Sequence, residues 1–140
     1  MPDKPVIPVF PISQQDARAY RDAGAALVAH VNERIAAHPD LARWLGPNDF
    51  RLLEDNHRNH HAMMSTVFVF SQYSLLLDIV PWVYRAYHAR ALDWDYFPAA
   101  FAAWTNALDA ALPANAASTI RPVYEWLITA HNQFIELSLQ

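Results

Sequence analysis

The stretch from Phe50 to Phe70, FRLLEDNHRNHHAMMSTVFVF, decides the fold class of this chain. Its apolar residues recur at intervals of three or four residues, or of several whole helical turns. This is the spacing of one face of an α-helix. They are Phe50, Leu53, Met64, Val67 and Phe68. The polar residues 54–61 interrupt this face. The stretch therefore predicts one long helix whose core-facing side carries polar groups along part of its length.

The interruption, Glu54 to His61, holds three histidines and two carboxylates within eight residues. Four-residue spacing places His57 and His61 on one side of the helix, and Glu54 lies one turn before His57. Polar groups on a buried face are costly unless they are satisfied by internal hydrogen bonds or by a ligand, and the sequence leaves both open. A one-residue shift of helix phase exchanges His60 for His61, so the spacing does not determine which imidazoles are buried.

The other segments also favour helices. Ser13, followed by Asp16, resembles a capping box at the start of a helix. Gly46-Pro47 is a strong breaker. The predicted helices cover residues 13–37, 40–45, 49–70, 74–90, 95–112 and a last segment from about 115 to near the end. Asn48 or Asp49, and later Asp93 or Asp95, are the expected caps.

The domain organisation follows from these segments. Residues 1–12 contain four prolines and predict an extended arm without a core of its own. Residues 13–140 suit one domain. We therefore predict a single all-α domain of five or six helices, arranged as a helical bundle or as a globin-like fold.

Composition excludes several classes of function. The net charge is −4, there is one lysine, and the arginines form no basic stripe, so nucleic acid is not an expected partner. The absence of cysteine excludes disulfides, thiolate catalysis and iron–sulfur clusters. With two glycines, the chain lacks the glycine-rich loops that hold phosphates.

Location is predicted from the apolar segments. The N-terminus lacks the basic start and apolar core of a signal peptide. The longest apolar region, residues 67–84, is interrupted by Ser71, Gln72, Asp78 and Pro81 and is not expected to span a bilayer. We therefore predict a cytoplasmic protein with no membrane partner.

A metal or haem site is one hypothesis for the cluster. His57 and His61 have the spacing that binds a metal from one helix, with Glu54 as a further ligand. The Glu-x-x-His pattern occurs once, whereas carboxylate-bridged di-metal bundles need it twice. His88 follows the cluster by 27 to 31 residues, about the separation of the haem-facing histidines in globins, so haem or a single metal ion held by Glu54, His57, His61 and His88 is the alternative prediction.

A ligand pocket is the leading hypothesis. Eighteen residues are aromatic, five of them tryptophan, and many follow the predicted kink at Pro81. Aromatic rings bind a flat or extended ligand, such as a tetrapyrrole or a lipid, at low entropic cost, although core packing or a dimer interface explains them equally well. The predicted ligand-binding residues are His57, His61, Met64, Trp82, Tyr87 and Trp104.

Residues 52–113 resemble the all-helical domains that precede cobalamin-binding modules in bacterial regulators. The resemblance rests on the segments Leu77–Tyr84, Ala89-Arg90, Phe101–Trp104 and Ala107–Pro113. Ala91 stands where such domains are expected to have glycine, and the cobalamin-ligating Asp-x-His-x-x-Gly motif is absent. The chain is also similar to the globin-like, haem-free sensor domains of bacterial stress-signalling proteins.

Both resemblances imply a regulatory or ligand-sensing role without cobalamin chemistry. The sequence therefore predicts a small-molecule-binding regulatory domain, expected to form a homodimer and not expected to be an enzyme.

Overall fold

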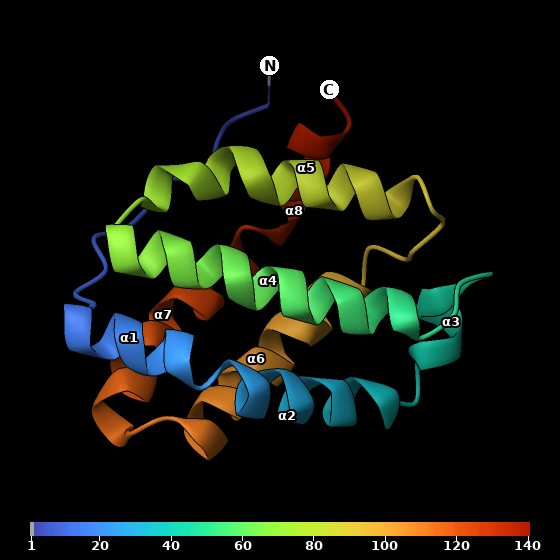
Figure 1. Cartoon of the computed structure of the whole chain (residues 1–140). Coiled ribbons are helices and arrows are strands. Elements are labelled where there is room, and N and C mark those ends of the chain that lie inside the picture. Colours follow the sequence, from blue (N-terminus) through green and yellow to red (C-terminus); the bar gives the residue numbers. More distant parts are fainter. Residues whose placement is uncertain (1) are drawn as a thin grey trace.

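The computed structural model describes residues 2–140, and within them every regular element is helical (Figure 1). The predicted all-α class is confirmed. The helices are α1 (Gln14–Asp22), α2 (Gly24–Ala36), α3 (Leu41–Leu45), α4 (Arg51–Phe70), the 3₁₀ helix η1 (Tyr73–Leu75), α5 (Leu76–His88), α6 (Tyr96–Ala111), α7 (Ala114–Thr129) and α8 (His131–Ser138). None of them is long and apolar enough to cross a membrane.

The structure has eight α-helices where five or six were predicted. Two predicted helices are each divided in two. The first breaks at Ala23 into α1 and α2, and the last breaks at Ala130 into α7 and α8. At the first break both halves contact α4, but α1 also packs on α7 and α2 also packs on α6. At the second break α7 packs on α1 and α6, whereas α8 packs on α5.

Ser13 caps α1 as predicted, whereas Phe50 and Asp95, the residues directly before α4 and α6, make no side-chain capping bond. Ser13 Oγ accepts a backbone N–H bond of 3.0 Å in the first turn of α1. Asp49 Oδ1 accepts the Arg51 N–H at 2.8 Å, and Asp93 Oδ1 accepts the Asp95 N–H at 2.8 Å. These bonds satisfy donors that a helix start or the turn before it leaves free.

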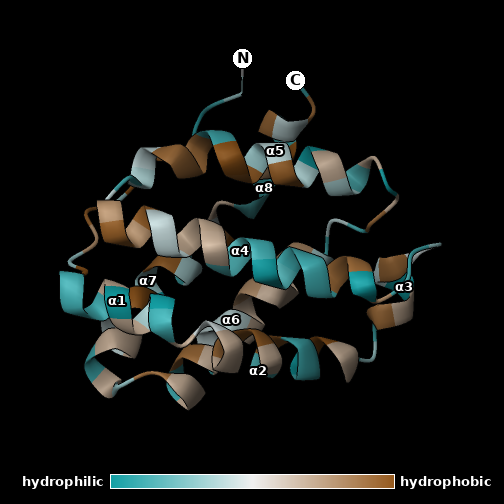
Figure 2. Ribbon diagram, viewed as in Figure 1, coloured by the Kyte–Doolittle hydropathy of each residue, from teal (hydrophilic) through white to brown (hydrophobic). Residues whose placement is uncertain are grey.

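Helix α4 packs closely against α1, α2 and η1 and reaches α6 and α7 through side-chain hydrogen bonds. The helices α1 and α2 lie against one side of α4, and α6 packs against both α2 and α7 (Figure 1). Figure 2 shows that the half of α4 near Phe70 is largely hydrophobic, whereas the half that carries the polar cluster is mostly hydrophilic. The fold therefore surrounds a helix that is polar along part of its length.

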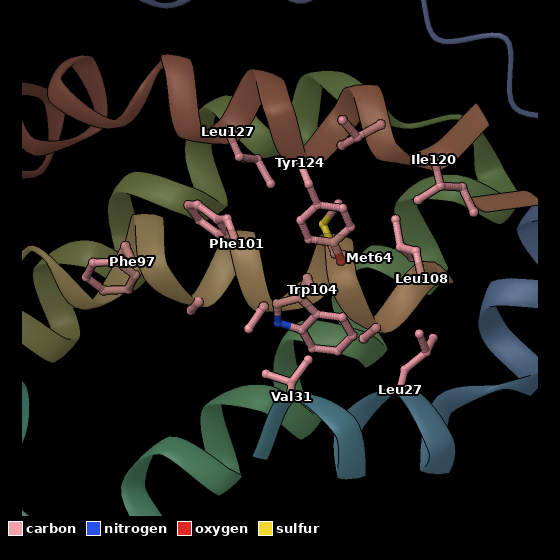
Figure 3. Packing of buried hydrophobic residues seen from close by; sticks show 14 of the residues in the cluster. Leu27, Val31, Met64, Phe97, Phe101, Trp104, Leu108, Ile120, Tyr124 and Leu127 are labelled. Atoms are coloured by element: carbon pink, nitrogen blue, oxygen red, sulfur yellow. The ribbon is translucent and has the colours of Figure 1, made fainter. Parts of the chain in front are cut away.

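Large apolar side chains fill the centre. Figure 3 shows Trp104 of α6 and Tyr124 of α7 near Met64 of α4, with Leu27 and Val31 of α2 beside the indole. All five are almost completely buried. Burial of one such aliphatic side chain stabilises a fold by roughly 1.5–3 kcal/mol.

The N-terminal arm packs against the helical domain. Residues 2–13 form no helix; Met1 lies outside the described residues. Phe10 is buried with its ring 5.3 Å from that of Tyr73 and 6.3 Å from that of Trp126. Trp126 Nε1 also donates a hydrogen bond of 2.8 Å to the Val6 carbonyl.

Helix α5 is attached differently from the others. It packs closely against α8, and its approach to α4 and α6 is looser. Tyr84 shares a hydrogen bond of 2.7 Å with His131 Nδ1, and Arg85 Nε donates to the Ser138 carbonyl at 2.9 Å. Among residues 2–140, these two are the side-chain hydrogen bonds that α5 makes to another helix, and both go to α8.

Two residues that follow helix ends are strained, one directly after α4 and one in the turn after α5. Ser71 has φ 52° and Ala91 has φ 67°, and no other non-glycine residue in the described part of the chain has a positive φ. This left-handed conformation costs an L-residue roughly 1–2 kcal/mol. A glycine in place of Ala91 would adopt this positive φ without strain.

We predict that Ala91→Gly raises the free energy of unfolding by about 0.5–1 kcal/mol, because glycine adopts a positive φ without strain. Ala89→Gly is the matched control, since Ala89 has φ −60° and gains nothing from glycine. It should lower the free energy of unfolding by about 0.5–1 kcal/mol. Denaturant titration measures both, and equal destabilisation by the two variants would contradict the assigned strain.

Candidate functional site

The polar cluster of α4 turns its imidazoles toward the protein interior. His57 is fully buried, and His60 and His61 are half-buried. Asp55 and Arg58 lie on the exposed side of the helix and form an ion pair with each other. The three histidines have different partners, and these partners decide what each can do.

His57 is satisfied completely by protein groups. Asn56 Nδ2 donates to the Tyr96 hydroxyl at 2.9 Å, and that hydroxyl donates to His57 Nε2 at 2.7 Å. His57 Nδ1–H then donates to Asn32 Oδ1 at 2.5 Å. The direction of the chain is fixed because an amide nitrogen only donates and an amide oxygen only accepts. Neither nitrogen of His57 is left for a ligand.

His61 holds the junction between α1 and α2. Its Nε2–H donates to the Tyr20 carbonyl at 2.8 Å, and its ring stacks on the Tyr20 ring at 4.9 Å. Gly24 makes room for this ring, because a Cβ there would lie 2.5 Å from His61 Cε1. His61 is therefore a structural residue at this junction.

His60 belongs to a chain of hydroxyl groups. Its Nε2 lies 2.9 Å from the Tyr124 hydroxyl, which lies 2.7 Å from the Tyr20 hydroxyl. Each hydroxyl can donate or accept, so the chain has two proton arrangements. No residue of the described chain bonds His60 Nδ1, and the ring lies 4.8 Å from that of Trp104.

A cavity of about 270 Å³ lies between α4, α5 and α6. Its α4 wall is mostly polar and consists of Asn56, Asn59, His60 and Met63. The other two walls are apolar and mainly aromatic, with Trp82, Tyr84, Tyr87, Phe97, Phe101 and Trp104. The cavity lies where α5 faces α4 and α6, helices to which it packs less closely than to α8.

Three of the predicted ligand-binding residues line this cavity. They are Trp82, Tyr87 and Trp104. Trp104 is buried, whereas Trp82 is 63% exposed and lies at the cavity mouth. The structure thus brings together aromatic residues that are far apart in the sequence.

The other three predicted ligand-binding residues do not line the cavity. His57 and His61 make the protein contacts described above, and Met64 packs in the core (Figure 3). Neighbouring residues of α4, His60 and Met63, take their place at the cavity wall.

The sequence analysis missed the α4 residues that line the cavity. Asn56, Asn59, His60 and Met63 follow the spacing i, i+3, i+4, i+7, which defines one face of a helix. This face is shifted by about one residue from the face of His57 and His61. The signal was present in the spacing, but only the packing of α5 shows which of the two faces meets a cavity.

The predicted metal ligands are not brought together. Within residues 2–140, no three histidine, aspartate or glutamate side chains are arranged to hold a metal ion. His57 has no free nitrogen. His88 lies at the end of α5, where its ring stacks on Trp94 at 3.9 Å. The set Glu54, His57, His61 and His88 therefore does not form a site.

The cavity is also too small for the predicted haem or another tetrapyrrole. An apolar protein cavity of about 150 Å³ accommodates one benzene molecule. A cavity of about 270 Å³ therefore suits one or two small rings. A tetrapyrrole is several times larger.

The cavity is uncharged at neutral pH. Burial lowers the pKa of His60 to about 3 and that of His57 to about 4, so both imidazoles are neutral. Burial also raises the pKa values of the Tyr84 and Tyr87 hydroxyls, which stay protonated. The lining contains no aspartate, glutamate, lysine or arginine.

A second hollow lies on the opposite edge of the cluster, between α2 and α4. Its volume is about 440 Å³, but it is an open groove bounded by these two helices. His61 and Asn32 line it together with Arg58 and small residues of α2. A ligand there would stay largely in contact with water, so we take the enclosed cavity as the candidate site.

No known protein family, no curated protein and no solved structure matches this chain. The function is therefore argued from the cavity and its surroundings.

We predict that acid destabilises the fold between about pH 6.5 and pH 4. The folded pKa values of His57 and His60 lie below the ordinary value of about 6.5, so the unfolded chain binds more protons in this range. The stabilisation that the two neutral imidazoles give the fold is fully present above about pH 6.5. As pH falls below this value, the free energy of unfolding decreases by up to about 1.4 kcal/mol per pH unit for each imidazole.

Urea titrations at pH 7, 6 and 5 measure this decrease. The free energy of unfolding should depend less on pH in His57→Gln and in His60→Gln than in the wild type, in each case by the contribution of one imidazole. An unchanged slope in both variants would contradict the buried, neutral state of these rings.

We predict that Gly24→Ala lowers the free energy of unfolding by about 1–3 kcal/mol, because the added Cβ would overlap the His61 ring. His61→Ala removes the overlapping ring. In that background Gly24→Ala should be neutral or stabilising, as expected for alanine in a helix. A double-mutant cycle by urea titration gives the coupling, and additive effects would contradict the contact.

Proposed function

We propose that this chain is a cytoplasmic regulatory or sensory domain that binds a small molecule in the cavity between α4, α5 and α6. The observation that carries the proposal is an aromatic cavity whose α4 wall includes His60, an imidazole whose Nδ1 has no protein partner within residues 2–140. A bound molecule would supply the missing partner of His60 Nδ1.

The lining supports binding rather than catalysis. Beside His60 it contains no carboxylate, serine or threonine that could form a nucleophile–base pair. The polar groups are two amides, one imidazole and the tyrosine hydroxyls of α5. Such groups orient a ligand, and the aromatic residues around them supply the contact area.

The attachment of α5 supports a regulatory role. Helix α5 forms one wall of the cavity and is bonded to α8, and the turn after it contains the strained Ala91. A molecule that binds more tightly to one position of α5 shifts the population toward that position. Movement of α5 with α8 would then report the occupancy of the cavity to a partner.

We also propose that the domain acts as a homodimer. Phe70 at the end of α4 and Trp82 of α5 are large apolar side chains that are 66% and 63% exposed. Association would remove such surface from water. Sedimentation equilibrium should give twice the chain mass of 15.9 kDa, and a monomer at all concentrations would contradict this part of the proposal.

We predict that the wild-type protein binds members of a neutral aromatic fragment library, and that Ala100→Leu abolishes this binding. Ala100 is buried on α6 and lines the cavity, so the larger side chain fills it. Ala102→Leu is the matched control, because Ala102 is exposed on the same helix. Ligand-observed NMR with thermal denaturation measures binding.

Fragments that bind the wild type and Ala102→Leu but not Ala100→Leu support the proposal. A wild-type protein that binds no fragment, or fragments that bind Ala100→Leu equally well, would overturn it.

A further inference from the structure

We infer that the cavity accepts an uncharged aromatic molecule of one or two fused rings with one hydrogen-bonding N–H or O–H group, such as an indole or a phenol, anchored by His60. This inference rests on the proposed function and names the class of ligand for the same cavity.

Size sets the first limit. The cavity volume of about 270 Å³ is less than twice the roughly 150 Å³ that accommodates benzene. It therefore admits a single substituted ring or two fused rings.

Shape sets the second limit. Two walls are mainly aromatic, and their rings already pack against one another. The Tyr84 and Phe97 rings stack at 4.0 Å, and Trp104 stacks on Tyr124 at 6.0 Å. Such rings are held in place and present flat or edge-on surfaces, which favour a flat aromatic ligand over a branched aliphatic one.

Charge sets the third limit. No ionisable acidic or strongly basic side chain lines the cavity. The nearby charges of α4, Asp55 and Arg58, lie on the exposed side of the helix and pair with each other. Burial of an ionised ligand without a charged partner is costly, so carboxylates and ammonium groups are disfavoured.

The polar anchor sets the fourth limit. His60 lines the cavity, its Nε2 is bonded to Tyr124, and its Nδ1 has no partner within residues 2–140. When Nε2 carries the proton, Nδ1 accepts a hydrogen bond from a ligand N–H or O–H group. When the Tyr20–Tyr124 chain donates toward Nε2, Nδ1–H donates to a ligand oxygen. A phenol fits both arrangements, and an indole fits the first.

Isothermal titration calorimetry at pH 7.5 tests this assignment with four probes: indole, 1-methylindole, indole-3-acetate and tryptamine. Indole should bind the wild type. 1-Methylindole has no donor and should bind about tenfold more weakly, because it loses one hydrogen bond. The anionic and cationic probes should bind at least tenfold more weakly than indole.

Two variants show where indole binds. Ala100→Leu should abolish indole binding, and Ala102→Leu should leave it unchanged. His60→Leu should remove the difference between indole and 1-methylindole. The difference in affinity between indole and 1-methylindole is also measured in the wild type. The test therefore remains decisive if His60→Leu does not fold.

Each alternative outcome overturns a defined claim. If other fragments bind in an Ala100-dependent manner but neither indole nor phenolic fragments do, the ligand class is wrong and the proposed function stands. Indole that binds equally to Ala100→Leu, or charged probes that bind as tightly as indole, also overturn the ligand class. If neither fragments nor indole bind, the proposed function fails as well.

Discussion

Buried imidazoles must be hydrogen-bonded, and this requirement connects α4 to four other helices. His57 bonds α2 through Asn32 and α6 through Tyr96. His60 bonds α7, and through it α1, while His61 bonds the end of α1 directly. The cost of leaving such a group unpaired in the interior is about 1–3 kcal/mol, so these bonds constrain the positions of α1, α2, α6 and α7 around α4.

Helix α5 lies outside this hydrogen-bond network, and this arrangement leaves the cavity between α5 and the helices of the network. Its side-chain hydrogen bonds to other helices go to α8 through Tyr84 and Arg85. Between the α4 network and the α5–α8 pair, the contacts are made by large aromatic side chains, which leave space between them. The cavity is therefore at the boundary between two internally bonded parts of the domain. A molecule there would contact both parts, which is the arrangement that a ligand-dependent movement requires.

The sequence predicted much of the fold because most of its signals are local. Helical spacing, the cap at Ser13 and the breaker at Gly46-Pro47 act within a few residues, and the corresponding helices are present. The breaks at Ala23 and Ala130 were not predicted, because alanine favours helix. Gly24, directly after the first break, was the one local signal for it. They account for the difference between the predicted and the observed number of helices.

A cavity between α4 and aromatic side chains was predictable, and Trp82, Tyr87 and Trp104 were predicted to line it, but the α4 residues of its lining were not. The polar cluster and the aromatic excess indicated a cavity beside α4, but a one-residue difference of helix phase separates His61 from His60, and the packing of α5 decides between them. The partners Tyr20 and Tyr124 lie 41 and 64 residues from the histidines they bond, so no local pattern could reveal them.

The most direct test of this account is a ¹⁵N NMR spectrum of the histidine side chains, recorded from pH 7.5 to pH 5. The account predicts that His57 is a neutral Nδ1–H tautomer and that neither His57 nor His60 becomes protonated in this range. Titration of either ring near pH 6.5, or an Nε2–H tautomer at His57, would contradict it.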